Sequence, residues 1–211
     1  MSVTAIPFWL DEPYQPRPAL EGRVEAEVCV IGAGVAGLSC ARRLAGHGLD
    51  TVVLERRTAA GGASGRNGGF LLAGPAAFYP DAREKYGAER ARLIYARTLE
   101  TQEEMYALAE RLGVGDAMRR VGLLRVSASE KEADHVRRHA QALSEDGFPA
   151  ELVEHDSLPA AVGRYAYNGV LTDHDGALHP GRWIRALARD AENAGARIHE
   201  DTPVERPVRA P

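Results

Sequence analysis

The stretch Val28-Cys-Val-Ile-Gly-Ala-Gly-Val-Ala-Gly37 decides the fold, together with Thr51-Val-Val-Leu-Glu55 that follows it. The first has the pattern of a strand, a glycine-rich turn and the start of a helix, and the second is a strand ending in an acid. Gly32, Gly34 and Gly37 have the GxGxxG spacing, which allows a tight turn, close approach of a pyrophosphate and close packing of the helix on the sheet. The pattern predicts a βαβ unit that binds a dinucleotide.

The residues around this turn predict how the dinucleotide is held. We expect its pyrophosphate to lie over the N-terminus of a helix at 36–45, where unpaired N–H groups and the helix dipole favour an anion. Glu55 lies roughly 20 residues beyond the glycines, the separation at which a carboxylate accepts a hydrogen bond from the adenosine ribose. Its charge disfavours the 2′-phosphate of NADP, although Arg56 and Arg57 are adjacent, and leaves NAD and FAD. The alternative is a Rossmann-like turn without a ligand.

A second glycine-rich stretch, Gly61-Gly-Ala-Ser-Gly-Arg-Asn-Gly-Gly-Phe70, follows Glu55. Such a stretch can run extended beside a flat ligand and direct N–H groups at phosphate or ring oxygens. Ser64 adds a hydroxyl, and Arg66 adds a guanidinium suited to phosphate or to a polar ring edge. This stretch favours FAD, and the alternative is a flexible surface loop.

Gly32–Gly37 and Gly62–Gly69 together resemble the FAD-dependent oxidoreductases of the D-amino-acid oxidase and glycine/sarcosine oxidase superfamily, and most closely the γ-glutamylputrescine oxidase branch. The arm at Phe8–Pro13 fits that branch, and Asp175–Arg182 is similar to the point where such enzymes re-enter the FAD domain. The resemblance implies FAD as the cofactor and a small-molecule amine or amino acid as the substrate. It also implies hydride transfer to the flavin, which oxygen or another acceptor reoxidises.

The resemblance implies that the chain is the N-terminal half of such an enzyme. Beyond the segment that matches Arg197–Val204, relatives continue with more FAD-domain strands, the rest of the substrate sheet and a flavin-contacting motif. The expected fold class is therefore α/β, a truncated Rossmann-type FAD-binding domain with part of an inserted α+β substrate domain. The alternative is a compact two-layer domain that is complete in itself.

The candidate cofactor-binding residues come from the motif and the resemblance together. Residues 63–69 are expected beside the pyrophosphate and the flavin, with Arg66 near the ring, and Val204 falls where relatives offer backbone to the adenine. The candidate set is Gly32, Ala33, Gly34, Ala36, Gly37, Glu55, Arg56, Ala63, Ser64, Arg66, Asn67, Gly68, Gly69 and Val204. No metal ligand is assigned. No catalytic residue is assigned either, because the substrate-binding groups of such enzymes lie largely in the other half.

The chain is expected to have four parts. They are an N-terminal arm at 1–26, the first part of the FAD-binding domain at 27–117, a partial substrate domain at 118–176, and a return to the FAD-binding domain at 177–211. Besides the βαβ unit, the expected elements are helices at 88–112, from Ser129 to Gly147 and from Pro180 to Gly195, and strands at 121–127, 151–153, 169–172 and 197–199. The tail at 203–211 is interrupted by proline and supports little regular structure.

Composition places the chain among ordinary globular proteins, with 45% apolar and 27% charged residues in 211. The net charge of −4 gives no reason to expect nucleic acid binding, and no apolar run approaches the length of a membrane span. The cytoplasm is the expected location. We expect the two cysteines, Cys29 and Cys40, to be small buried core residues. A face left uncovered by a missing half predicts self-association.

Several polar side chains outside the glycine stretches have simple structural interpretations. His135 and His139 stand one helical turn apart, and a solvated helix face is favoured over a metal site. Asp173–Asp175 is typical of a polar turn, and His179 is expected to pack at a helix N-terminus. Tyr165 and Tyr167 would line a pocket or stand half-buried in a strand. Two functions from other classes stay open: an NAD-linked dehydrogenase, and a non-catalytic remnant that binds FAD weakly or binds a partner protein.

Overall fold

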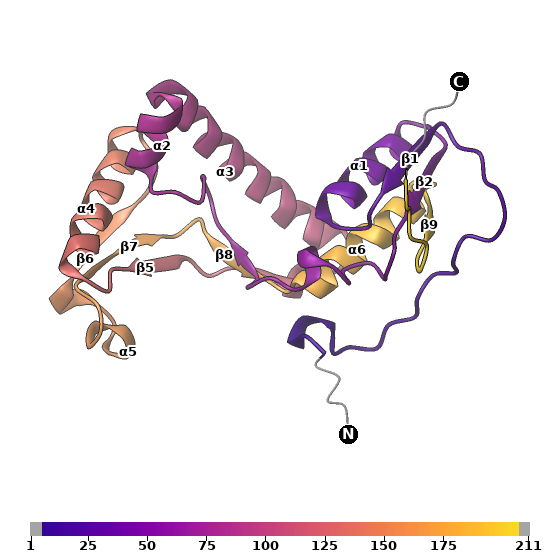
Figure 1. Ribbon diagram of the computed structural model, residues 1–211. Coiled ribbons are helices and arrows are strands. Elements are labelled where there is room, and N and C mark those ends of the chain that lie inside the picture. Colours follow the sequence, from indigo (N-terminus) through magenta and orange to yellow (C-terminus); the bar gives the residue numbers. More distant parts are fainter. Residues whose placement is uncertain (1–5, 207–211) are drawn as a thin grey trace. The chain divides into compact units, whose positions relative to one another are not determined.

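The computed structural model describes residues 6–206, so 1–5 of the arm and 207–211 of the proline-interrupted tail lie outside the described residues. Contacts divide the chain into two compact units (Figure 1). The first comprises residues up to 69, 109–117 and those from 178 onward, and the second comprises 70–108 and 118–177. The predicted organisation places 70–108 with the FAD-binding part, whereas the structure groups them with 118–177. The roles of the two units as cofactor and substrate domains stay a prediction.

The first unit is built on a parallel sheet with the strand order β1-β2-β9. Its strands are β1 (Val28–Ile31), β2 (Thr51–Leu54) and β9 (Arg197–His199), in a register that pairs Val30 with Val53 and Val53 with Ile198. The central strand β2 is the most deeply buried, since Val52 and Val53 are at most 1% exposed. Parallel strands need crossover connections, and the glycine-rich turn with the helix at residues 35–46 connects β1 to β2.

Two helices pack beside this sheet and against each other, α1 (Val35–Gly46) and α6 (Pro180–Asn193). α6 begins with Pro180 in its first turn, where a missing N–H costs nothing. It buries an apolar face that includes Trp183, Ile184 and Leu187. The short 3-10 helices of this unit are η1 (Phe8–Leu10), η2 (Ala63–Gly65) and η3 (Gly115–Ala117). The predicted helices at 36–45 and from Pro180, and the strand at 197–199, are confirmed.

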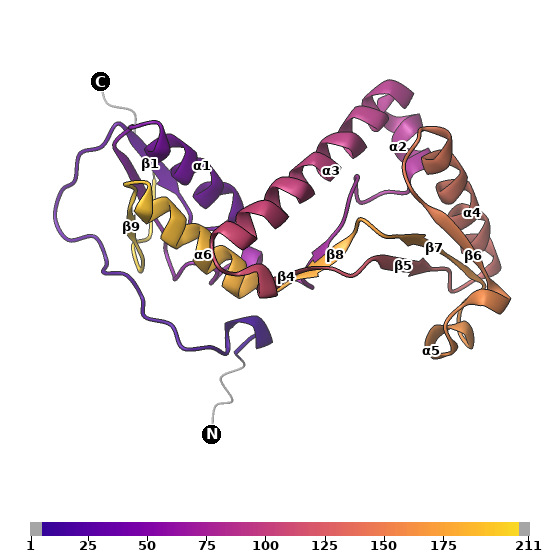
Figure 2. The ribbon, with the colours of Figure 1, turned by 180° about the vertical axis from the view of Figure 1, so that it is seen from behind.

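The second unit contains an antiparallel sheet with the order β5-β7-β6. Its strands are β5 (Leu123–Val126), β6 (Glu151–Glu154) and β7 (Asn168–Thr172), and α4 (Glu130–Glu145) lies along them (Figure 2). The predicted helix start is confirmed, because the Ser129 hydroxyl accepts from the Glu132 N–H at 3.3 Å. The Glu132 carboxylate in turn accepts from the Ala128 N–H at 2.7 Å.

The remaining elements of the second unit are less regular. α2 (Tyr79–Tyr86) precedes the long α3 (Ala88–Arg111), most of which belongs to this unit, and Tyr79, Tyr95 and Leu143 form part of its core. A second small sheet has the order β3-β8-β4, from β3 (Phe70–Leu71), β4 (Met118–Arg120) and β8 (Gly176–Leu178), and η4 (His155–Ser157) and α5 (Ala160–Gly163) follow β6. Sequence periodicity did not predict α2, α5 or these strands, because α2 is strongly charged and the others are too short to show a period.

The expectation that both cysteines are buried is wrong, since both are exposed. The Cγ1 of Val30 lies 3.3 Å from the position of a Cβ on Gly37, so Val30 faces α1. Successive side chains of a strand point to opposite faces, so Cys29 and Ile31 point away from that helix. Ile31 is 57% exposed, and self-association through such apolar surface stays a prediction. Cys40 lies on α1 outside its buried positions, Leu38, Ala41 and Ala45.

Both thiols are therefore expected to react with an aromatic disulfide reagent in the folded chain, as fully as they do in denaturant. The measurement is the number of thiolate equivalents released in native buffer. Cys29→Ser and Cys40→Ser should each remove one reacting thiol. A thiol that reacts only after unfolding would contradict the exposure of its strand or helix position.

Candidate functional site

The glycine-rich turn between β1 and α1 has the backbone geometry that its glycines predict. Gly32 adopts φ +98°, a conformation that L side chains rarely take, and its N–H donates to the Leu54 carbonyl at 2.8 Å. A Cβ on Gly37 would lie 2.0 Å from the Gly32 carbonyl oxygen, so only glycine allows the helix to start so close to the turn. α1 begins after Gly34, and the first-turn N–H groups of residues such as Ala36 have no helical carbonyl to bond.

Glu55 lies directly beside this turn. One carboxylate oxygen accepts from the Ala33 N–H at 2.8 Å, and the other accepts from the Arg57 N–H at 2.8 Å. Each oxygen of a carboxylate has two acceptor positions, so both oxygens keep one for a further donor. Glu55 therefore holds the turn in place and still has capacity for the two hydroxyls of a ribose.

The second glycine-rich stretch meets the first at the N-terminus of α1. The Ser64 hydroxyl accepts from the Val35 N–H at 3.0 Å, and a Cβ on Gly34 would lie 2.9 Å from that hydroxyl oxygen. Gly65 is as constrained as Gly37, because its Cβ would lie 2.1 Å from the Ala60 carbonyl oxygen. The structure thus joins the two motifs that the sequence singled out separately.

Asn67 and Gly69 shape the end of the second stretch. The Asn67 amide donates to the Ser64 carbonyl at 2.9 Å, and its oxygen accepts from the Gly69 N–H at 2.9 Å. Gly69 adopts φ +72°, and its carbonyl accepts from the Leu178 N–H at 2.7 Å. The Asn67 side chain therefore orders the loop, and its role toward a cofactor stays a prediction.

The other predicted site residues lie near the two glycine-rich stretches. None of their contacts tests whether they bind the cofactor. Ala63, Arg66 and Gly68 are exposed, as are Ala36 and Arg56. Val204 is half-buried in the segment after β9, where the Thr202 N–H donates to the Glu55 carbonyl at 2.8 Å. The structure thus brings Gly32–Gly37, Glu55 and Ser64 together, and the contacts of Arg66 with a ring and of Val204 with an adenine stay predictions.

Sequence analysis did not predict the contacts of two residues beside the site, Glu200 and Trp9, although Trp9 lies in the arm at Phe8–Pro13. Glu200 is completely buried at the end of β9, and its carboxylate accepts from the Ala59 N–H at 2.8 Å. Trp9 of the arm donates its indole N–H to the Asn67 carbonyl at 2.8 Å. Neither has a local sequence signal, because each partner lies far away in the chain.

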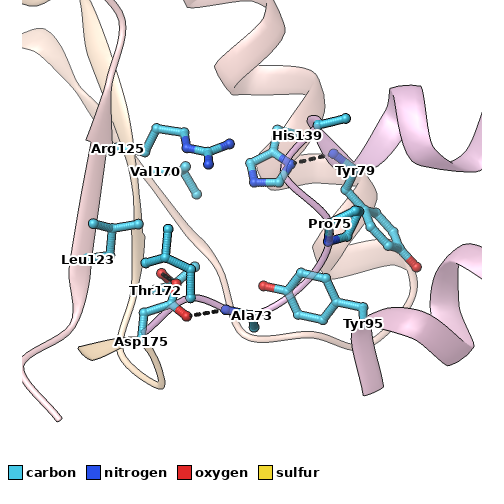
Figure 3. Close-up of a pocket in the computed structure, with 12 residues that line it drawn as sticks. Ala73, Pro75, Tyr79, Tyr95, Leu123, Arg125, His139, Val170, Thr172 and Asp175 are labelled. Carbon is cyan, nitrogen blue, oxygen red and sulfur yellow. Dashed lines mark hydrogen bonds between the residues drawn. The ribbon is translucent and has the colours of Figure 1, made fainter. Parts of the chain in front are cut away.

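A separate cavity in the second unit is lined by residues from α2, α3, α4 and the sheet (Figure 3). Its volume is about 20 Å³, enough for roughly one water molecule and too small for an amine substrate. Arg125, His139 and Tyr95 point their polar ends toward it, and Asp175 borders it from the sheet side.

The interpretation of His139 as part of a solvated helix face is wrong. His139 is buried, and its Nδ1 accepts from the Tyr79 N–H at 2.9 Å. Burial, and then the nearby positive charge of Arg125, lower the pKa of His139 to about 4, so the ring is neutral at pH 7. His135, one turn earlier, is half-buried with its ring 6.0 Å from that of Phe78. Within residues 6–206, no group of three or more His, Cys, Asp or Glu side chains could hold a metal ion.

The turn at Asp173–Asp175 is polar, as predicted, but two of its residues are buried. The Asp175 carboxylate accepts from the Ala73 N–H at 2.7 Å and from the Thr172 hydroxyl at 2.6 Å. His174 Nε2 lies 3.1 Å from the Tyr95 hydroxyl. These bonds fix the turn between β7 and β8 to the segment after β3.

The predicted packing of His179 at a helix N-terminus is confirmed, because its Nδ1 accepts from the Arg182 N–H at 3.2 Å. Tyr165 and Tyr167 are 72% and 50% exposed and border an open surface pocket just before β7. None of the helices between residues 6 and 206 is both long enough and apolar enough to span a membrane.

Most of the chain can be aligned with known proteins. Residues 27–210 match the family described as FAD dependent oxidoreductase. The chain is 31% identical over 189 residues to gamma-glutamylputrescine oxidoreductase of Escherichia coli, and 28% identical over 188 residues to the probable oxidoreductase OrdL of Rhizobium meliloti. These alignments cover 89% and 88% of this chain and 44% of each relative, so the chain spans less than half the length of these curated relatives.

Solved structures show the same fold. Glycine oxidase from Geobacillus kaustophilus superposes with a TM-score of 0.68 at 24% identity, over 83% of this chain and 46% of that one. L-proline dehydrogenase from P. horikoshii superposes with a TM-score of 0.64 at 21% identity, over 90% of this chain and 46% of that one. The geometry of the two glycine-rich stretches and the match along residues 27–210 agree, and this chain belongs to the family of FAD-dependent oxidoreductases.

Proposed function

We propose that the first unit holds the adenosine diphosphate part of FAD, and that the protein oxidises an amine or an amino acid. The observation that carries the proposal is the meeting of three predicted parts at the N-terminus of α1. They are the turn at Gly32–Gly37, the carboxylate of Glu55 and the hydroxyl of Ser64. Outside this family, such a turn serves NAD as well as FAD, and the second glycine-rich stretch supports FAD.

The donor set fits the chemical character of the cofactor. Backbone N–H groups at the start of α1 and the positive end of its dipole suit a pyrophosphate. Glu55 has acceptor positions for the ribose hydroxyls, and its charge opposes a 2′-phosphate. Gly32 has open space where a Cβ would stand, so the backbone of the turn is accessible to a ligand.

The chemistry of the reaction is supplied by the flavin, which accepts a hydride when it is bound. The residues of this chain would bind and orient it: the turn would hold the pyrophosphate and Glu55 would hold the ribose, while Ser64 keeps residues 63–69 against the start of α1. Such positioning lowers the entropic cost of bringing the reacting atoms together.

The substrate class comes from the names of the relatives. One is a gamma-glutamylputrescine oxidoreductase, and the structural neighbours include glycine oxidase and L-amino acid deaminase from Proteus vulgaris. These names support a small molecule with an amino group as the substrate. No side chain of the described residues is assigned to catalysis.

Titration of the purified chain with FAD, followed by flavin fluorescence, tests the proposal. Glu55→Gln is expected to raise the dissociation constant about tenfold or more, because hydrogen bonds to a charged group contribute about 1.5–3 kcal/mol and a tenfold change is about 1.4 kcal/mol. The amide nitrogen of glutamine would also face a backbone N–H at one of its two contacts.

Glu27→Gln is the matched control. Glu27 also accepts from a backbone N–H, that of Asp50 at 2.7 Å, but it precedes β1, at the end of the strand opposite the glycine-rich turn. Its replacement should leave the FAD dissociation constant unchanged. Saturable binding of NADH without FAD binding would support the NAD-linked dehydrogenase instead. Equal effects of the two variants on the FAD dissociation constant would show that Glu55 does not bind the cofactor.

A further inference from the structure

We propose that the N-terminal arm acts as a positioning device for the FAD-binding loop, through the buried carboxylate of Glu200 and through Trp9. The loop is residues 55–69, which run from Glu55 to Gly69. This inference rests on the proposed function, because it assigns the arm a role in holding the same site.

Glu200 connects the arm to the loop. Its side chain is fully buried, and it accepts from the Ala59 N–H of the loop at 2.8 Å. The same oxygen accepts from the Arg17 guanidinium at 3.2 Å and from the Tyr14 hydroxyl, and the other oxygen accepts from the Arg17 N–H at 2.9 Å. One carboxylate thus receives donors from two segments that are far apart in the sequence.

The negative charge of Glu200 makes its bonds to the arm necessary. A buried carboxylate is strongly unfavourable unless donors and an opposite charge compensate it, so loss of its arm partners would leave it unpaired. Arg17 also forms an ion pair with Glu192 at 2.6 Å, which keeps the guanidinium in place. Burial, and then the carboxylate of Glu200, raise the pKa of Tyr14, so its hydroxyl stays protonated and donates.

Backbone N–H groups next to Glu200 also form hydrogen bonds with the start of the loop. The Asp201 N–H donates to the Arg57 carbonyl and the Thr202 N–H to the Glu55 carbonyl, both at 2.8 Å. On the arm side, the Leu20 N–H donates to the Thr202 hydroxyl at 3.0 Å. Residues 200–202 therefore lie between the arm and the residues that contact the glycine-rich turn.

Trp9 holds the far end of the loop. Its indole N–H donates to the Asn67 carbonyl at 2.8 Å, and its ring lies 4.9 Å from that of His179 in an edge-on contact. A Cβ on Gly181 would lie 2.1 Å from the Trp9 carbonyl oxygen, so glycine is required for this approach to α6. The arm thus reaches the loop at Ala59 through Glu200 and at Asn67 directly.

The test uses the full chain with Tyr14→Phe and Trp9→Phe combined. Tyr14→Phe removes only the hydroxyl, and Trp9→Phe removes the indole N–H while keeping an aromatic ring. The readout is hydrogen exchange at the Ala59 and Gly69 amides, both hydrogen-bonded in the structure. We expect the exchange rate at these two amides to increase. The increase should be about tenfold larger than the loss of global stability alone would produce. The FAD dissociation constant should rise about fivefold to tenfold.

Asp190→Asn is the control for a general loss of stability. Asp190 accepts from Arg42 at 2.5 Å between α6 and α1, and both side chains are largely buried, but neither contacts the loop. This variant should lower the melting temperature and leave the relative exchange of Ala59 and Gly69 unchanged. Glu200→Gln, which keeps the size of the side chain, should reproduce the local loosening at Ala59.

The two readouts separate the two proposals. Unchanged relative exchange at Ala59 and Gly69 in the double variant overturns the positioning role of the arm, whatever the affinity for FAD. Failure of the wild-type chain to bind FAD overturns the proposed function, and the exchange rates still decide whether the arm holds the loop.

Discussion

Replacing Gly37 with alanine is expected to abolish measurable FAD binding and to lower the free energy of unfolding by about 3 kcal/mol or more. The added Cβ would stand 2.0 Å from the Gly32 carbonyl oxygen, and both groups belong to main-chain segments that cannot turn aside as a side chain can. The start of α1 must then move away from the turn. That movement displaces the first-turn N–H groups and breaks the contact of Val35 with Ser64. Urea unfolding and flavin fluorescence titration measure the two effects.

Gly46→Ala is the matched control in the same helix. Nothing lies within 4 Å of a Cβ at Gly46, so alanine fits there, and because Gly46 is the last residue of α1 its higher helix propensity should stabilise the variant by roughly 0.5 kcal/mol or less. It should bind FAD as the wild type does. If Gly37→Ala bound FAD normally, the start of α1 would not be the pyrophosphate site, and the proposed function would lose its central support.

The sequence predicted the glycine-rich turn well because its signals are local. Three glycines, two apolar strands and one acid within 28–55 are enough to specify the turn, and the structure places Glu55 beside Ala33. The long helices were predicted equally well, since hydrophobic periodicity, a capping serine and a proline mark their limits. Each of these features is marked by residues that lie within one βαβ unit or one helix.

Features that depend on distant partners could not be predicted in this way. Glu200 follows a short strand and precedes an aspartate, and nothing nearby distinguishes it from a solvated acid. Its role comes from Tyr14 and Arg17 in the arm and from Ala59 in the loop. Cys29 was predicted to be buried and is exposed. An apolar strand sequence predicts burial, but it does not show which face of the strand a helix covers.

His139 shows the same limit in the second unit, where its position on a charged helix predicted solvation. Tertiary contacts decide otherwise: α2 places the Tyr79 N–H on one ring nitrogen, and β5 places Arg125 nearby. These contacts have a consequence for stability, because a histidine that must stay neutral in the fold makes folding depend on pH.

We expect the second unit to lose stability as the pH falls from about 6.5 toward 4. The ordinary pKa of histidine is about 6.5, and in the fold the pKa of His139 is lowered to about 4, first by burial and then by Arg125. Between these values the unfolded chain binds a proton that the folded chain excludes, so stability decreases with falling pH at up to about 1.4 kcal/mol per unit. Asp81 and Asp175 face the ring with negative charge and partly offset Arg125. Over the roughly 2.5 units between these two pKa values, the loss attributable to His139 is at most about 3.5 kcal/mol.

His139→Asn isolates this contribution, since the amide oxygen of asparagine can accept from the Tyr79 N–H and the side chain does not titrate. Urea unfolding followed by the NMR signals of α4 should show the variant less stable than the wild type at pH 7.5, and the difference should shrink toward pH 4.5. His135→Asn makes the same change one turn earlier and leaves the Tyr79 contact in place, so this variant should keep the loss of stability that His139 causes below pH 6.5. A constant difference between His139→Asn and the wild type across this range would mean that the buried ring accepts its proton as readily in the fold as in the unfolded chain. Burial of the ring and the charge of Arg125 oppose that result.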